Sequence, residues 1–454
     1  KGTARGLPAQ PPERQKSQIR IKNPRIGGGF GGKQHIHIEP YVAMVTMKTG
    51  RSARLALTRR EVFEATFTRH EMRVKVRLGA NSDGKLNAID MQVLSNTGAY
   101  GEHALTVFMV AGSKTLPLYN KVNAVRFGGH VVYTNKVSAG AFRGYGAIQG
   151  LTGLESAMDE LAHKIGIDPL ELRRKNMIHE GETSDVFRIM GEGTEGVAMT
   201  IESCKLEECI ARGKELIGWD PNRLVWDVAP GKVRAMGMAI AMQGSGLPLI
   251  DMGSARIEFQ DGGFFKLHIG ATDLGTGSDT ILAQIAAEEL GVDVENIIVY
   301  SSDTDNTPFD VGAYASSTTY VSGSAVIKAA RSLKKKLIEA VAQKFEVDPA
   351  FVLFDNKTFK TLNGGKSLSL YDFSFDTLYH DGERMKTLEA TESFTGAKSP
   401  PPYLAGFVEI ELDKETGKVE VVHYVSVADV GTPINPRLAT IQIEGAALQG
   451  IGLA

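Results

Sequence analysis

The segment Arg25–Gln34, RIGGGFGGKQ, has the residue types that let a protein backbone come close to a large ligand. Five glycines occupy six consecutive positions, and a residue without Cβ allows neighbouring amide groups to approach an anion. Two nucleotide-binding patterns fit this segment in part. Gly27, Gly29 and Gly32 match the dinucleotide pattern G-x-G-x-x-G, and Gly27, Gly32 and Lys33 match the phosphate-loop pattern G-x-x-x-x-G-K.

The context of the segment weakens both nucleotide interpretations. The dinucleotide pattern needs a strand directly before it and an acidic residue about 20 positions later. Here Asn-Pro-Arg separates a predicted strand at 18–22 from the glycines, and Arg59 and Arg60, which suit only the 2′-phosphate of NADP, stand where the acid should be. Gln34 occupies the position where a phosphate loop places Ser or Thr. A non-catalytic module that binds a cofactor or a nucleotide stays an alternative.

Two further groups have spacings that are typical of metal ligands. His35, His37 and Glu39 in HIHIE would share one side of an extended segment, and their types suit a zinc ion. Asp303 and Asp305 in SDTDNTPFD begin like a calcium loop, but Pro and Tyr replace the Gly and Glu that an EF-hand needs. The first group stays open as a metal-site hypothesis, and the second predicts turn or capping interactions.

The bulk properties describe a globular protein of two to four domains. The chain has 454 residues, of which 42% are hydrophobic and 23% charged, and its formal net charge is -2. Because no block of like charge and no apolar run of bilayer length occur, nucleic acid and membranes are not expected partners. Cys204 and Cys209 have neither a disulfide nor a metal-pair spacing, and two reduced thiols predict a cytoplasmic location.

The order of predicted helices and strands is mixed, which predicts an α+β fold. Residues 1–17 are polar and Pro-rich, and we expect a disordered lead-in or a processed end there. A polar, Gly-rich stretch at 180–200 divides a first domain at 18–180 from a second at 201–454. The second domain stops within a helical pattern, so we expect it to be incomplete at its C-terminus and the chain to be a piece of a larger polypeptide.

Three predicted hairpins suggest that the two domains are related mixed α/β subdomains. Each hairpin turns at a similar short polar sequence, and a Gly-rich loop and a helix follow it. The hairpins lie at 71–95, 254–270 and 405–430.

Five glycine-rich or polar segments carry a family resemblance across roughly residues 18–454. In chain order they resemble signatures of the molybdenum-binding subunit of the xanthine dehydrogenase/aldehyde oxidase family of molybdenum hydroxylases. The segments are RIGGGFGGKQ, SAGAFRGYGAIQG, GATDLGTGSDT, DTDNTPFDVGAYASSTTYVSG and GTPINPRLATIQIEGAALQGIGLA.

The resemblance implies a molybdenum–pterin cofactor, either molybdopterin or molybdopterin cytosine dinucleotide. Phe30 and Arg143 would lie beside the metal without binding it, with the Phe30 amide directed at a metal ligand. The helix starts near 278 and 318 would each offer an anion site. The implied cofactor-binding residues are Gly28, Gly29, Phe30, Gly31, Phe142, Arg143, Gly144, Gly275, Thr276, Gly277, Ser278, Ala315, Ser316, Ser317, Thr318 and Gln442.

The resemblance also implies a substrate pocket. Tyr145 takes the position where the family stacks a planar substrate. Gln34 and the region of Met109 replace the Glu and Arg with which xanthine-oxidising members hold a purine. These replacements favour a neutral N-heteroaromatic compound or an aldehyde, with xanthine or purine dehydrogenation as the alternative.

The implied reaction is hydroxylation of an electron-poor carbon with water as the oxygen source. The family's general-base Glu lies beyond the last pterin-binding helix, so we expect no catalytic residue in this chain and no activity from it alone. The base would come from a C-terminal segment or from a second molybdopterin-subunit piece. Electrons would pass to subunits or domains that carry [2Fe–2S] and FAD.

Overall fold

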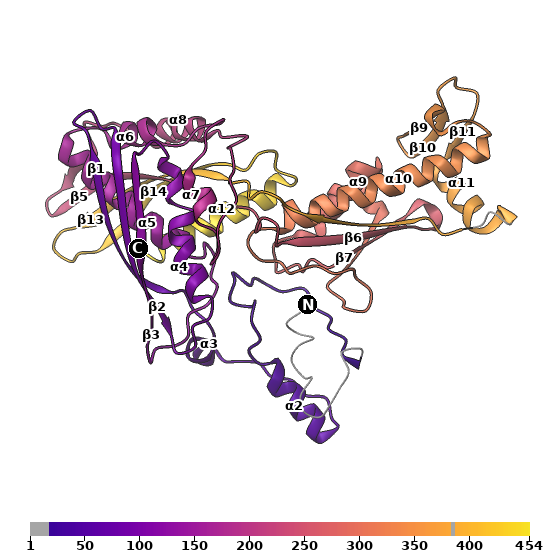
Figure 1. Ribbon diagram of the computed structural model, residues 1–454, viewed down its shortest axis with the longest axis horizontal. Coiled ribbons are helices and arrows are strands. Elements are labelled where there is room, and N and C mark those ends of the chain that lie inside the picture. The colour runs from indigo at the N-terminus through magenta and orange to yellow at the C-terminus, as the bar shows by residue number, and fades with distance from the viewer. Residues whose placement is uncertain (1–17, 383–385) are drawn as a thin grey trace.

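The computed structural model describes residues 18–382 and 386–454, and the lead-in predicted at 1–17 lies outside the described residues. Helices and strands are intermixed and gather into two bodies, each with its own hydrophobic core (Figure 1). This arrangement confirms the α+β class. No helix in the described part is both long and apolar enough to cross a bilayer.

The first body contains two sheets with helices packed against them. Its strands are β1 (Glu71–Ala80), β2 (Leu86–Gly98), β3 (Ala124–Tyr133), β4 (Val225–Ala229), β5 (Lys232–Met242), β13 (Tyr403–Asp413) and β14 (Val419–Asp429). Its main helices are α4 (Ala104–Ser113), α5 (Ala147–Ile165), α6 (Pro169–Asn176) and α8 (Leu206–Ile217). The strand orders are β1-β2-β3 and β14-β13-β5-β4. Along β2, Ile89, Met91 and Val93 are buried at alternate positions, as a strand with one face on a core requires.

The second body contains one larger sheet covered by two helices. Its main elements are β6 (Met252–Phe259), β7 (Phe265–Ile269), α9 (Ser278–Leu290), β8 (Ile297–Ser301), α10 (Gly323–Phe345) and β12 (Glu389–Thr395). The strand order is β12-β6-β7-β8. Ala325, Ala329, Leu333 and Leu337 recur every four residues along α10 and are fully buried, because this spacing places them on one helix face.

The remaining elements are shorter or lie outside the two main cores. They are α2 (Glu39–Thr49), α3 (Arg59–Ala65), α7 (Asp185–Ile189), β9 (Val352–Asp355), β10 (Thr358–Thr361), β11 (Ser367–Ser369), α11 (Leu370–Phe375) and α12 (Pro436–Ile451). Helix α12 lies between the two bodies (Figure 1).

The two bodies share one local order of elements. In the first body the hairpin β1–β2 is followed by α4 and then by β3, which is parallel to β2. In the second body the hairpin β6–β7 is followed by α9 and then by β8, which is parallel to β7. The loops at 99–103 and 270–277 therefore occupy equivalent positions between hairpin and helix. This repeat is what the predicted duplication requires.

The hydrophobic cores and the predicted domains divide the chain at different positions. The first core combines residues from Met72–Met242 with residues from Tyr403–Val427, because β13 pairs with β5. The second core lies within Ala255–Phe394. The division into 18–180 and 201–454 stays a prediction.

The strand predicted at 18–22 is wrong. Only Lys22 forms a β-bridge there, to Asp303. Side chains fix this segment instead: the Arg20 guanidinium donates to the Asp303 carboxylate at 3.1 and 2.5 Å, and the Ile21 amide donates to Thr304 Oγ1 at 3.0 Å. Asp303 therefore anchors the segment that leads into the glycines. Asp303 Oδ1 also accepts the Asp305 amide at 3.1 Å, which is the turn interaction predicted for it.

Candidate functional site

The glycine-rich loop needs its glycines for packing against another part of the chain. Gly31 has φ +95°, and a Cβ on it would lie 2.9 Å from the carbonyl carbon and oxygen of Ala141. The Arg143 amide donates to the Phe30 carbonyl at 2.7 Å across the same contact. The first two predicted segments are therefore in direct backbone contact, because no side chain separates them.

The third segment approaches the same loop from the second body. The Gly28 amide donates to the Leu274 carbonyl at 2.7 Å. A Cβ on Gly275, which has φ +87°, would lie 2.7 Å from the Ile26 carbonyl oxygen. The loop at 270–277 and the glycine-rich loop thus fit together without side chains between them.

Helix α12 closes this group of loops. The Arg143 guanidinium donates to the Gln442 carbonyl at 2.6 Å and to Gln442 Oε1 at 3.3 Å, and burial lowers the pKa of Arg143. One turn earlier on the helix, a Cβ on Gly277 would lie 2.6 Å from the Leu438 side chain. The last predicted segment is therefore held between the second and third.

The segment at 315–318 joins the group through the loop at 243–246. The Gly246 amide donates to the Ala315 carbonyl at 2.8 Å, and Gln243 Nε2 donates to the Gly144 carbonyl at 3.4 Å. Residues 243–246 thus connect the fourth segment to the second. All five predicted segments are joined by a continuous series of contacts.

Strained backbone conformations recur in these segments. Phe30, Tyr145, Ala315 and Ser316 have φ between +46° and +54°, although none of them is glycine. Such conformations cost of order 1–3 kcal/mol each and tend to occur at functional sites. Within the described residues, no group accepts a hydrogen bond from the Phe30 amide. This amide is therefore available to a ligand, and its role at the cofactor stays a prediction.

In the anion site predicted at the start of α9, three amides are already hydrogen-bonded within the chain. The Asp273 carboxylate already accepts hydrogen bonds from the amides of Gly275, Gly277 and Asp279, at 2.8–3.2 Å. A phosphate could not use these donors without displacing the carboxylate, which would also repel it. Ser278 Oγ, in contrast, is buried without a partner among the described residues. It remains a candidate ligand group.

Arg69 is a candidate that the sequence reasoning missed. Its guanidinium lies over the Phe142 ring at 4.6 Å from the centroid, and burial lowers its pKa. Both terminal nitrogens are buried and have no hydrogen-bond partner among the described residues. A buried cation without a partner is costly, so this position suits an anionic ligand beside Phe142. Arg69 belongs to no motif, and only the fold brings it to the site.

The three residues predicted for the substrate pocket lie around α4. The Tyr145 hydroxyl contacts His103 Nδ1 and lies 2.7 Å from Thr106 Oγ1, and burial raises the pKa of Tyr145. Gln34 ends the glycine-rich loop, and its backbone N–H donates to the Gly31 carbonyl at 3.3 Å. Met109 packs against the first core. Their contact with a substrate stays a prediction.

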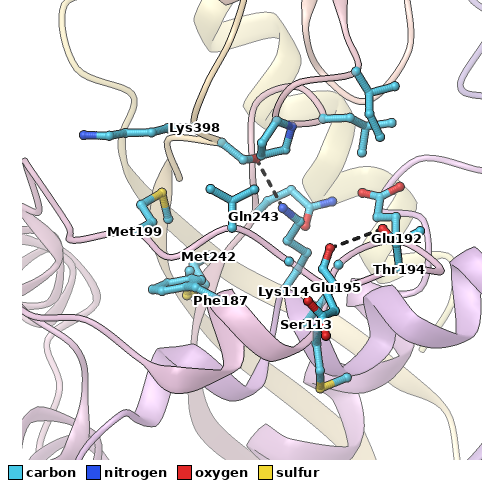
Figure 2. A pocket seen from close by; sticks show the side chains of 18 residues that line it. Ser113, Lys114, Phe187, Glu192, Thr194, Glu195, Met199, Met242, Gln243 and Lys398 are labelled. Atoms are coloured by element: carbon cyan, nitrogen blue, oxygen red, sulfur yellow. Dashed lines mark hydrogen bonds between the residues drawn. The ribbon is translucent and has the colours of Figure 1, made fainter.

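A pocket lined by charged side chains lies at the C-terminal end of α4. Figure 2 shows the side chains of Lys114, Glu192 and Gln243 lining it. Lys114 Nζ donates to Ser399 Oγ at 3.2 Å, and burial lowers the pKa of this amine. Burial also raises the pKa of Glu192 to about 7, although Lys114 opposes the shift. Neither residue belongs to a motif of the sequence.

The Glu192 carboxyl predicts a specific dependence of stability on pH. Its pKa lies near 4.5 in the unfolded chain and about 7 in the folded protein, so between these values the folded state binds more protons. The free energy of unfolding should therefore fall as pH rises from 4.5 to 7, by on the order of 2–3 kcal/mol. The variant Glu192→Gln should lose this dependence. Urea unfolding of both proteins at several pH values tests it, and parallel curves would contradict it.

The metal group predicted in HIHIE is wrong. Glu39 Oε2 accepts hydrogen bonds from the amides of His37 and Ile38 at 2.9 and 3.0 Å, and His37 Nε2 contacts the Gly32 carbonyl at 2.8 Å. Helix α2 begins at Glu39, so the segment is not extended. His35 points elsewhere, to residues of the loop before α4.

Comparison with known proteins identifies the family to which this chain belongs. The molybdopterin cofactor-binding domain is matched twice, over residues 7–177 and 212–454. The chain belongs to this family. It is the molybdopterin-binding part of a protein of the xanthine dehydrogenase/aldehyde oxidase type, and molybdenum–pterin is the cofactor of such domains.

Two relatives of this molybdopterin-binding chain come from Escherichia coli. "Probable hypoxanthine oxidase XdhD" of strain K12 is 37% identical over 96% of this chain and 45% of its own length. "Xanthine dehydrogenase molybdenum-binding subunit" of strain O157:H7 is 35% identical over 96% of this chain and 58% of its own length. The chain thus spans about half the length of these relatives.

A solved structure shares the molybdopterin-binding fold. Quinoline 2-oxidoreductase from Pseudomonas putida 86 superposes with a TM-score of 0.83 at 24% identity, over 95% of this chain and 56% of that chain. This likeness concerns the fold, and it includes both bodies described above. The individual cofactor-binding residues stay predictions, with Arg69 added to them.

Proposed function

We propose that this chain is the molybdopterin-binding part of a molybdenum hydroxylase that acts on an electron-poor carbon of an N-heteroaromatic compound, with water as the oxygen source. The observation that carries the proposal is the convergence of five loops near the Phe30 amide and the Arg69 guanidinium, which have no hydrogen-bond partner in the described part of the chain. Both groups suit an anionic cofactor. The same loops contain the strained backbone conformations of Phe30, Tyr145, Ala315 and Ser316.

The molybdenum–pterin group, when bound, supplies the oxygen-transfer and electron-accepting chemistry. In this proposal the chain holds the group by hydrogen bonds from the Phe30 amide and Ser278 Oγ and by the charges of Arg69 and Arg143. The Arg143–Gln442 hydrogen bonds fix α12 over the loops. Tyr145, whose hydroxyl is held by Thr106, offers its ring as a wall for a planar substrate.

The electrons would leave to partner subunits or domains that carry [2Fe–2S] and FAD, and the protein would act in the cytoplasm. The described residues contribute binding and orientation in this proposal, and no proton transfer to the substrate is assigned to them.

A purine is the second candidate substrate. Two relatives at 35–37% identity are named as a hypoxanthine oxidase and a xanthine dehydrogenase subunit. Against this, Gln34 stands where xanthine-oxidising members carry a Glu. An amide at this position can still exchange hydrogen bonds with a neutral purine such as hypoxanthine, but it cannot pair with a positive charge.

The complete protein, purified with its partners, tests the proposal. We expect one molybdenum and one pterin per chain and turnover of quinoline-like compounds or hypoxanthine that incorporates oxygen from labelled water. Turnover of aldehydes without turnover of any heteroaromatic compound would show that the substrates are aldehydes and would contradict the proposed substrate class. Tight NADP binding without molybdenum would instead establish a nucleotide-binding module and overturn the proposal.

Position 34 provides a matched test of substrate choice. In the complete, molybdenum-loaded protein, Gln34→Glu should raise kcat/KM for xanthine relative to quinoline by about tenfold or more, because a charged hydrogen bond contributes roughly 1.5–3 kcal/mol. Gln34→Leu removes the amide without adding charge and should not raise this ratio. Equal ratios in the Glu variant and the parent protein would place residue 34 outside the substrate pocket.

A further inference from the structure

Three potential metal ligands converge beside Tyr145. His35 Nε2 lies 2.5 Å from His103 Nε2 and 3.2 Å from Glu102 Oε2. All three ligand atoms lie within 4.8 Å of one another. His35 comes from the end of the glycine-rich loop, whereas Glu102 and His103 come from the loop between β2 and α4. The fold, not the local sequence, brings them together.

When both histidines are neutral, these three atoms cannot all form hydrogen bonds with one another. A neutral imidazole carries one N–H, and a carboxylate only accepts hydrogen bonds. If His103 Nδ1–H donates to the Tyr145 hydroxyl, which it contacts, its Nε2 carries a lone pair. A single proton on His35 Nε2 then faces two acceptors. A cation in the centre would satisfy all three atoms at once.

The ligand set has the chemistry of a zinc-type site. Two imidazole nitrogens and one carboxylate oxygen, with a fourth position left for water, are typical of zinc centres that exchange a ligand. Two nitrogens on one tetrahedral ion lie about 3.3 Å apart, so His35 and His103 would separate by somewhat less than 1 Å. Both rings are only half-buried and can make this movement.

Neighbouring groups would orient the ligands. The His35 ring contacts the Phe67 ring edge-on at 5.4 Å between centroids. His103 holds a left-handed backbone, with φ +51°, directly before α4, and its other ring nitrogen contacts the Tyr145 hydroxyl. A partner on the second ring nitrogen is the usual device that fixes a histidine ligand. Here that partner is also the predicted wall of the substrate pocket.

We propose that His35, Glu102 and His103 form a binding site for a divalent transition-metal ion of the zinc type, separate from the molybdopterin site. The ion joins the end of the glycine-rich loop to the start of α4. In doing so it holds the His103 ring against the Tyr145 hydroxyl. The inference does not depend on the hydroxylase activity, because its test measures binding of the ion itself.

Cobalt(II) is a suitable probe, since it takes zinc positions and absorbs visible light. Addition of Co²⁺ to the metal-free chain should give one bound ion per chain, with ligand-field bands of a nitrogen- and oxygen-ligated site of low coordination number. Zn²⁺ should displace the cobalt and raise the Tm of the protein. Absorption bands of a thiolate–cobalt bond would instead identify Cys204 or Cys209 as the ligand and overturn the assignment.

Variants of the three ligands make the test residue-specific. His35→Ala and His103→Ala should each weaken Zn²⁺ binding by about 100-fold or more, and Glu102→Gln by about tenfold. His37→Ala is the matched control, because His37 contacts the Gly32 carbonyl and not the cluster; its affinity should equal that of the parent. If His103→Ala does not fold, His35→Asn and Glu102→Gln carry the test. Unchanged affinity in these variants would overturn the site.

Discussion

Replacing Gly31 by alanine is expected to remove the molybdenum–pterin cofactor from the protein. The new Cβ would lie 2.9 Å from the Ala141 carbonyl group, and the residue would have to hold φ +95°. Overpacking and backbone strain of this kind cost about 1–3 kcal/mol each. The loop would move away from Phe142 and Arg143 and break the hydrogen bond from the Arg143 amide to the Phe30 carbonyl. Molybdenum content per chain should fall by about tenfold or more.

Gly27 gives a control in the same loop. A Cβ on Gly27 meets no atom within 4 Å, and its φ lies outside the left-handed region. Gly27→Ala should therefore keep the molybdenum content of the parent protein, as measured by metal analysis of both variants after identical purification. Equal molybdenum in Gly31→Ala and Gly27→Ala would show that the contact at Gly31 does not support the cofactor site.

Replacing Arg173 by methionine is expected to give the largest loss of stability. Arg173 is fully buried, and its guanidinium donates to Glu155 Oε2 and Asp159 Oδ1, both at 2.7 Å. Glu155 also accepts the Tyr119 hydroxyl at 2.5 Å and the Ile240 amide at 2.9 Å. Without Arg173 the Glu155 charge would stay buried and unpaired, at a cost of about 3–5 kcal/mol.

The neighbouring Arg174 is the matched control for this variant. Its ion pairs with Glu171 and Glu207 are partly exposed, so Arg174→Met should cost about 1 kcal/mol or less. Urea unfolding followed by tryptophan fluorescence measures both, because the chain's two tryptophans, Trp219 and Trp226, lie in the first body. Similar midpoints for the two variants would show that the buried network does not stabilise the first body.

The sequence predicted the fold class and the segments that meet at the candidate site because both depend on local patterns. Alternating and helical spacings predicted the hairpins and the long helices, and glycine-rich motifs predicted loops whose backbones must pack closely. The series of contacts from Phe30 through Arg143 to Gln442 agrees with these predictions.

What the sequence could not predict depends on contacts between distant residues. Arg69 stands alone in the sequence, and its lack of a partner is visible only where the fold places it over Phe142. His35 was assigned to the wrong group because its real neighbour, His103, is 68 positions away. One local interaction was missed as well: the Asp273 side chain, four residues before Gly277, accepts hydrogen bonds from three of the amides at the start of α9.

The pairing of β13 with β5 has a consequence for synthesis on the ribosome. The first core needs residues from Tyr403–Val427, so it cannot close until β13 and β14 have emerged. The second core, within Ala255–Phe394, is an insertion that is complete earlier. We expect the inserted body to fold first during translation, since domains generally fold as units as they leave the ribosome. Until β13 arrives, the apolar edge of β5 stays open to chaperones and to aggregation.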